Sequence, residues 1–277
     1  MLVIPVGLAF YLSRKFNLGW RLWWIGGVTF ILSQVGHIPF NLALTYLFQE
    51  GILPQPSGNY ALLFNSVILG LSAGLWESMA RYASFRWWAK DARNWMKGIF
   101  VGAGHGGVES IILGCLVLAN FVSMIVARNM ELNTLVSPEQ IESAQAQLSA
   151  YWDLPWYFPL IGVMERVFTM IVHISLSLMV MQVFTRRKLF WLFLAIIWHS
   201  FLDGVAVYAS QTLDPIVTEV VIGSFAVVSL GIIFALRQSE QDVEEWITYD
   251  NPYSDPTGEM LTDIEENSDN LDRSRFI

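Results

Sequence analysis

Charge is scarce in this sequence. Of its 277 residues, 14% are charged and 54% are hydrophobic, whereas soluble domains carry about 25% charged residues. This deficit excludes an ordinary soluble domain and indicates a membrane protein. The 12 tryptophans agree, because tryptophan is favoured at both bilayer interfaces. Basic residues form no patch outside short loops, so nucleic acid is not expected as a partner.

Several familiar catalytic motifs are missing as well. The single cysteine, Cys115, lies in an apolar run, which excludes a disulfide and a cysteine-based zinc site. There is no HExxH metalloprotease helix and no GxSxG serine turn. An aspartyl protease needs two carboxylates that share a site, and Asp203 is the only aspartate deep in a hydrophobic segment. These absences leave few known protease mechanisms open.

Long hydrophobic runs dominate what is present. Seven segments can be drawn, most of them longer than the ~20 residues that span a bilayer: about 1–13, 20–48, 60–82, 98–127, 156–184, 189–210 and 214–236. The first is short and reads as a clipped span, a different start codon or a leader-like run. We predict an all-α fold for residues 1–237, a polytopic transmembrane helical bundle of seven or eight spans. Residues 238–277 are predicted to form an acidic, disordered cytoplasmic tail.

Basic residues predict the orientation of this bundle. Twelve of them flank one set of connections, whereas the alternating connections carry only Arg128. The positive-inside rule places the first set in the cytoplasm, with the N-terminus outside and the C-terminus inside. The outer loop 129–154 is predicted to hold an amphipathic helix, with Ser137 as its cap and Pro138 at its first position.

All four histidines lie inside hydrophobic segments, and three share them with carboxylates one or two turns away. An ionisable side chain at membrane depth costs roughly 2.5–3.5 kcal/mol on insertion scales. Residues four apart share a helix face, so four segments each aim a polar stripe in one direction: Glu77 and Arg81; His105 and Glu109; Glu165, Thr169 and His173; His199 and Asp203. At 1.5 Å per residue, most of these groups come roughly 8–15 Å from the cytoplasmic ends, with Glu165 deeper. We therefore predict one shared polar site in the cytoplasmic half.

Other residues near these stripes have simpler expected roles. Arg166 is expected to pair with a glutamate, Glu165 or Glu109. His37 is expected to satisfy backbone groups freed by Pro39 and to lie outside the site. Four glycines predict either a close helix approach or a helix break beside His105: Gly102, Gly104, Gly106 and Gly107.

Carboxylates and imidazoles together suit general acid–base hydrolysis. A glutamate can deprotonate water, and a histidine can donate to the leaving group or oxyanion. We predict an intramembrane endopeptidase that needs no cofactor. A metal such as zinc is an open alternative, held by a His/His/Glu set or by His105, His173 and His199.

Two non-hydrolytic functions also stay open. One is a non-catalytic membrane scaffold with a degenerate protease-like site. The other is a proton- or metal-coupled transporter, in which Glu/His chains relay charge. Transporters often contain internal repeats, and none is evident in this sequence.

The motifs together resemble a known superfamily. The pattern Glu77-xxx-Arg81, a histidine on a later helix, and His199-xxx-Asp203 resembles the CAAX-protease and bacteriocin-processing (CPBP) superfamily of glutamate-type intramembrane endopeptidases and its PrsW relatives. The segments GHGGVES, MERVFTMIVH and WHSFLDG look most like YhfC-like membrane peptidases, over nearly the whole membrane region. This resemblance implies membrane-bound protein or peptide substrates within a lipid bilayer, and an integral protein of a bacterial plasma membrane.

The resemblance also implies roles for individual residues. Glu77 would be the catalytic glutamate, oriented by Arg81, and His199 would stabilise the oxyanion. The sequence departs from the superfamily in two places. Its Phe-xxx-His is Thr169-xxx-His173 here, and its Glu-Glu pair is Trp76-Glu77, which leaves the choice of base open. Glu109, the second-motif glutamate of the PrsW branch, or Glu165 is a candidate for the missing carboxylate. The predicted catalytic residues are Glu77, Arg81, His105, Glu109, Glu165, His173, His199 and Asp203.

Overall fold

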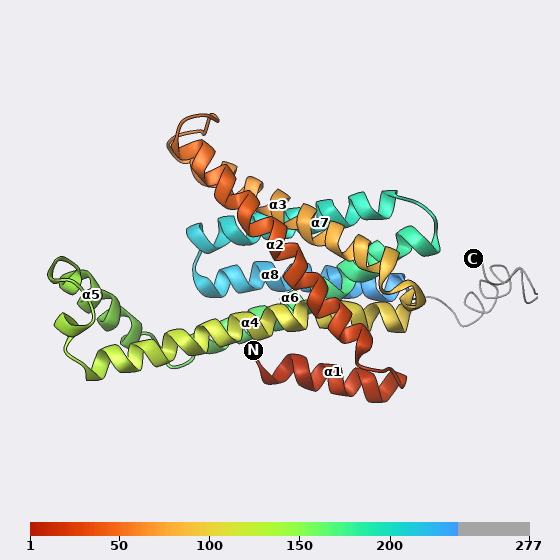
Figure 1. The fold of residues 1–277 in the computed structure, drawn as a ribbon, viewed down its shortest axis with the longest axis horizontal. Helices are drawn as coiled ribbons and strands as arrows, with labels where there is room; N and C mark the ends of the chain where they lie inside the picture. The colour runs from red at the N-terminus through yellow and green to blue at the C-terminus, as the bar shows by residue number, and fades with distance from the viewer. Residues whose placement is uncertain (238–277) are drawn as a thin grey trace, which may run out of the picture. The chain divides into compact units, whose positions relative to one another are not determined.

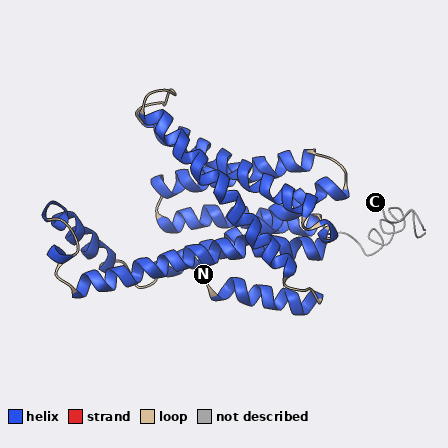
Figure 2. Cartoon of the chain, viewed as in Figure 1, coloured by secondary structure: helices blue, strands red, loops and turns tan. Residues whose placement is uncertain are grey.

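Six long helices make up most of the computed structural model, which describes residues 1–237 (Figures 1 and 2). Each is long and apolar enough to cross a membrane: α2 (Arg21–Gln49), α3 (Asn59–Trp87), α4 (Trp95–Asn129), α6 (Phe158–Thr185), α7 (Phe190–Thr212) and α8 (Pro215–Ala235). None of the described residues lies in a strand. The predicted all-α transmembrane fold is confirmed, while the predicted tail, 238–277, lies outside the described residues.

Two shorter helices complete this part of the chain. Helix α1 (Val3–Phe16) has 14 residues, about 21 Å at 1.5 Å per residue, which is short of the ~30 Å hydrocarbon core. The first predicted span is therefore not among the six. Helix α5 (Ile141–Trp152) follows a 3₁₀ turn that starts at Pro138, within the segment predicted to be helical. Ser137 precedes this turn, but its hydroxyl faces Glu139 and caps no backbone group.

Helix α6 is the central helix of the bundle. It has the largest buried share among the six, with 72% of its most apolar window inside the protein. Its buried face carries polar side chains, Ser175, Ser177 and Gln182. Large apolar side chains on the other helices, such as Leu116 and Phe234, are exposed. The interior thus holds polar side chains beside an apolar core, while apolar side chains cover the outside, as a lipid solvent requires.

Glycines set the spacing of the helices that carry the polar stripes. A Cβ atom on Gly104 would lie 2.0 Å from the backbone oxygen of Trp23, so α4 touches α2 backbone to backbone. On the other face of α4, a Cβ atom on Gly106 would lie 2.9 Å from Cδ2 of His173 on α6. Helix α4 runs unbroken through this region. The glycines were predicted to allow either a close helix approach or a helix break. The structure shows the close approach of α4 to α2 and α6.

The basic connections meet at one end of the bundle, which we call the basic end. There, Arg21 at the start of α2 pairs with Asp91 in the turn η1 (Lys90–Ala92) between α3 and α4. The Arg21 guanidinium donates to this carboxylate and holds the pKa of Asp91 below its ordinary value. Arg93, from the same connection, stacks on the ring of Phe184 near the end of α6. That the basic end faces the cytoplasm stays a prediction.

Candidate active site

Glu77 lies at the centre of a buried polar cluster. Its Oε2 atom is 3.0 Å from Nε2 of His105 on α4 and 3.3 Å from Nη2 of Arg81, one turn further along α3. The same oxygen is 3.7 Å from Nε2 of His199 on α7 and 4.0 Å from Nδ1 of His173 on α6. The residue is only 6% exposed. Three other helices therefore direct side chains at one buried carboxylate.

His173 has a partner on each ring nitrogen. Its Nδ1 lies 2.7 Å from Nη2 of Arg81, and its Nε2 lies 2.5 Å from Oε2 of Glu109. A guanidinium can only donate, so Nδ1 accepts and Nε2 carries the proton that faces Glu109; the tautomer follows from these partners. The Nδ1 lone pair therefore points into the cluster.

A second ring of charges surrounds this centre. Arg166 Nη1 lies 2.8 Å from Oε1 of Glu109, and Nη2 pairs with Glu165. On α7, Nε2 of His199 lies 3.3 Å from Oδ2 of Asp203. The structure thus brings all eight residues predicted from the sequence into one connected network. Arg166, expected to pair with one of two glutamates, pairs with both.

A small cavity opens against one side of the network. Its volume is about 100 Å³. Arg81 and His105 do not line it, whereas the other six predicted residues do: Glu77, Glu109, Glu165, His173, His199 and Asp203. Apolar side chains such as Leu202 and Ile222 complete its wall. A reactant in this cavity would meet carboxylates and imidazoles on one side and apolar groups on the other.

Helix α2 also contributes to the site, which the sequence did not reveal. Nε2 of Gln34 lies 3.4 Å from Oε1 of Glu77, whereas the three histidines contact Oε2. Oε1 of Gln34 lies 3.2 Å from Nδ1 of His37. His37 was expected to serve the backbone, but its ring nitrogens meet the side chains of Gln34, Ser72 and Asn41. The spacing of Gln34, His37 and Asn41 along one helix face is the signal that could have found them.

Helix α8 contributes a carboxyl group that was also missed. Glu219 is 5% exposed and is close enough to Glu165 and Arg166 to interact electrostatically. Glu219 is the single charged residue of 215–236, and its place in that apolar run was the available signal. Its carboxyl extends the network to a fifth helix besides α2.

The centre of the cluster has the donors of a metal site. One ligand atom each from Glu77, His173 and His199 lies within 4.8 Å of the other two. Two imidazoles and one carboxylate can bind a catalytic zinc ion and leave an open position. The Glu109 carboxylate behind His173 fits this use, because metal-bound imidazoles commonly donate their other N–H to a carboxylate. By residue type and protonation pattern, this set fits a divalent metal ion.

Two features of the metal site differ from the sequence-based expectation. His105 was expected among the ligands, but its Nε2 faces Glu77, which takes its place in the group. Arg81 lies against the lone pair of His173, so a metal ion and Arg81 compete for that nitrogen. The donor set does not support the prediction that the protein needs no cofactor.

Comparison with known proteins adds a family assignment. The sequence model of a family described as "YhfC intramembrane metalloprotease" matches residues 1–242. The chain is also 26% identical over 209 residues to the "Uncharacterized membrane protein YhfC" of Bacillus subtilis (strain 168), which covers 74% of this chain and 79% of that relative. No solved structure matches the chain. The predicted resemblance to YhfC-like peptidases and the integral membrane location are confirmed.

Proposed function

The chain belongs to the YhfC intramembrane metalloprotease family, and from this premise we propose that it is a metal-dependent endopeptidase for membrane-associated proteins or peptides. The observation that carries the proposal is the convergence of Glu77, His173 and His199 from three helices. Buried ionisable groups are costly in a membrane. A hydrolytic site explains why these ionisable groups are buried together, whereas a non-catalytic scaffold does not need them.

Glu77, His173 and His199 would hold the metal ion. When bound, such an ion supplies a Lewis acid that polarises the scissile carbonyl and acidifies a water molecule. The surrounding residues orient the ligands. Oε2 of Glu109 lies 2.5 Å from Nε2 of His173, and His105 donates to Glu77. Arg166 in turn fixes Glu109, so the second ring of charges holds the first in place.

Asp203 is the carboxylate best placed to act as the base. It lines the cavity, and 29% of its side chain is exposed. Glu109, by contrast, is engaged on both oxygens by Arg166 and His173. In this proposal the water oxygen adds to the carbonyl carbon and the water proton passes to Asp203. Asp203 then gives that proton to the amide nitrogen as the carbon–nitrogen bond breaks.

One contact favours a different role for Glu77. Arg81 donates to Glu77 at 3.3 Å, as expected for a glutamate that is oriented to act as the base itself. In that mechanism the protein is a glutamate-type protease, and the histidines stabilise the oxyanion and leaving group. The two assignments share the substrate class and the site. They differ in whether activity survives removal of metal.

The test compares new peptide termini in membranes of bacteria that express the full chain or its variants. Wild type and Glu142→Gln, a matched control on α5, are expected to produce the same new termini. Glu77→Gln and His199→Ala should produce none at equal expression. Identical termini from wild type and Glu77→Gln would refute the proposal.

A second step separates the two roles of Glu77. The purified chain is assayed on a substrate found in the first step, before and after exhaustive chelation. The metal-dependent mechanism predicts loss of cleavage and recovery when the metal is restored. Full activity in metal-free protein would instead assign Glu77 as the base.

A further inference from the structure

Helix α2 carries a chain of hydrogen-bonded side chains that ends at Glu77. Asn41 Nδ2 lies 2.9 Å from Nε2 of His37, and Nδ1 of His37 lies 3.2 Å from Oε1 of Gln34. Nε2 of Gln34 lies 3.4 Å from Oε1 of Glu77. If Asn41 donates to His37, every link donates in the same direction, toward the carboxylate. We call Asn41, His37 and Gln34 the α2 chain.

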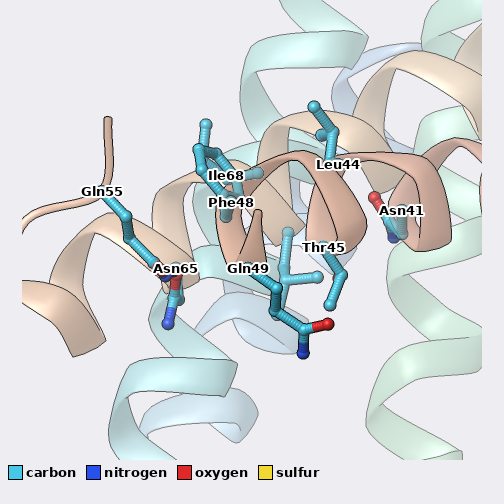
Figure 3. Close-up of a pocket in the computed structure, with 9 residues that line it drawn as sticks. Asn41, Leu44, Thr45, Phe48, Gln49, Gln55, Asn65 and Ile68 are labelled. Atoms are coloured by element: carbon cyan, nitrogen blue, oxygen red, sulfur yellow. Dashed lines mark hydrogen bonds between the residues drawn. The ribbon is translucent and has the colours of Figure 1, made fainter. Parts of the chain in front are cut away.

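The other end of the α2 chain lies at a polar cavity of about 280 Å³ between α2 and α3 (Figure 3). This cavity is near the end of the bundle opposite the basic end, where α2 finishes at Gln49. Apolar side chains make up much of its wall: Leu44, Phe48, Ile68 and Leu69. Its polar lining is neutral: Asn41, Thr45, Gln49, Gln55 and Asn65. Thr45, Gln49 and Gln55 are exposed, so the cavity opens to the outside of the bundle.

The lining chemistry selects a small, neutral, hydrogen-bonding occupant. No charged side chain lines the cavity, which disfavours an ion or a phosphate. Amides and hydroxyls both donate and accept, as water does. Within the described residues 1–237, Oδ1 of Asn41 is buried with no hydrogen-bond partner. A water molecule in the cavity would supply the missing donor, since buried waters bind to otherwise unsatisfied polar groups.

Hydrolysis needs a water molecule to reach Glu77 while a substrate fills the cavity beside the histidines. The cavity beside the histidines is only about 100 Å³, so a bound peptide would displace most of its water. The α2 chain approaches the opposite oxygen of Glu77. Oγ of Ser72 also lies 3.1 Å from Nε2 of His37, which gives this nitrogen a second partner beside Asn41. The side chains of the α2 chain can therefore exchange hydrogen-bond partners when a water molecule passes.

We propose that the cavity between α2 and α3 and the α2 chain form the path by which water reaches Glu77 while a substrate occupies the other side. This inference rests on the proposed protease function. Gln34 and His37 act as positioning residues, and Asn41 lies at the mouth of the path. The reactant carried is one water molecule for each peptide bond hydrolysed.

Water access is tested without any protease assay. Cys115 is replaced by serine, and single cysteines are introduced at Asn41 or Asn65 of the full chain in lipid vesicles. Leu42→Cys is the control, because Leu42 is 65% exposed at nearly the same depth but faces lipid. A charged, water-soluble thiol reagent is applied to both faces. Thiols react as thiolates, which form in water, so Asn41→Cys and Asn65→Cys should label at least about tenfold faster than Leu42→Cys. Labelling of Asn41→Cys no faster than the control would overturn the proposal.

Kinetics test whether the path supplies the reaction. Asn41→Leu should lower kcat about tenfold and leave KM within about twofold, because the substrate cavity is untouched; a loss of this size is ordinary for one group in a proton- or water-handling network. Asn41→Ser, which keeps a polar side chain, should recover most of the rate, and Leu42→Ala should match wild type. Unchanged kcat in Asn41→Leu would contradict the proposal. If wild type cleaves nothing, the proposed function fails, and labelling still decides water access.

Discussion

At the scale of single residues, Arg81 and a bound metal ion would compete for the same nitrogen of His173. Its Nδ1 lone pair faces Nη2 of Arg81 at 2.7 Å. The same nitrogen lies 4.0 Å from Oε2 of Glu77, with which His173 forms the group of metal donors. Two positive charges this close repel by several kcal/mol at the effective dielectric of a protein interior, about 4 kcal/mol at 4 Å. Arg81 must therefore release His173 when a metal ion binds, or it weakens that binding.

This competition gives a prediction for Arg81→Met, which keeps much of the side-chain volume. Its affinity for the metal should rise at least about tenfold, because a like charge is removed from the site. Cleavage should fall, since Arg81 also orients Glu77. Competition against a chelator of known affinity measures the effect. Arg86→Met, an exposed arginine on the same helix, should bind metal as wild type does, and weaker binding by Arg81→Met would contradict the competition.

The charged part of the site could be predicted from the sequence, and the uncharged part could not. His105, Glu109, His199 and Asp203 stand out because ionisable groups are rare in apolar segments. Gln34 carries no charge and is common in helices, so only its contact with Glu77 reveals its role. The choice of Glu77 over His105 as a metal ligand depends on side-chain direction. Spacing along one helix does not contain that information.

At the scale of helices, glycine contacts hold the site together. A Cβ atom on Gly104 would meet the Trp23 backbone oxygen at 2.0 Å, whereas nothing lies within 4 Å of such an atom on Gly231. Gly104→Ala should therefore push α4 from α2 and lower the free energy of unfolding by about 1–3 kcal/mol. Gly231→Ala should be neutral or slightly stabilising. Unfolding in a mixed-detergent titration measures both, and equal stability of the two variants would refute this packing.

The ion pair between Arg21 on α2 and Asp91 in η1 should weaken in acid. Arg21 holds the pKa of Asp91 below its ordinary value, so the pair stabilises the fold above about pH 4, the ordinary aspartate range. That stability is lost as the pH falls through the lowered pKa. Both side chains are 56% exposed, so the pair is worth no more than about 1 kcal/mol. The melting temperature of wild type should be slightly above that of Arg21→Ala at pH 7, and the two should be equal at strongly acidic pH. A difference in melting temperature that grows in acid would contradict this.

Helix existence could be predicted well, and helix ends less well. Hydropathy identified 60–82 and 98–127, but the helices run on to Trp87 and Asn129. Lipid-facing apolar residues produce the hydropathy signal. The helical hydrogen bonds continue into polar turns that this signal does not detect. The first segment shows the converse, since α1 is mostly apolar but its 14 residues are too few for the six-helix set.

At the scale of the whole molecule, the basic end and the polar cavity lie at opposite ends of α2. The positive-inside rule predicts that the basic end is cytoplasmic. In a Cys115→Ser background, Ser143→Cys on α5 should react with an impermeant thiol reagent in intact cells. Lys188→Cys at the basic end should react only after permeabilisation. The reverse pattern would invert the topology and place the cavity between α2 and α3 on the cytoplasmic side.

The metal content of the purified full chain and its variants tests the central claim most directly. Wild type should bind about one divalent metal ion per chain, as a single catalytic site requires. Glu77→Gln, His173→Ala and His199→Ala should each lose most of it, while His105→Gln should keep it. A wild-type chain that binds no metal after growth in metal-replete medium, or metal lost with His105 and kept without Glu77, would contradict the site described.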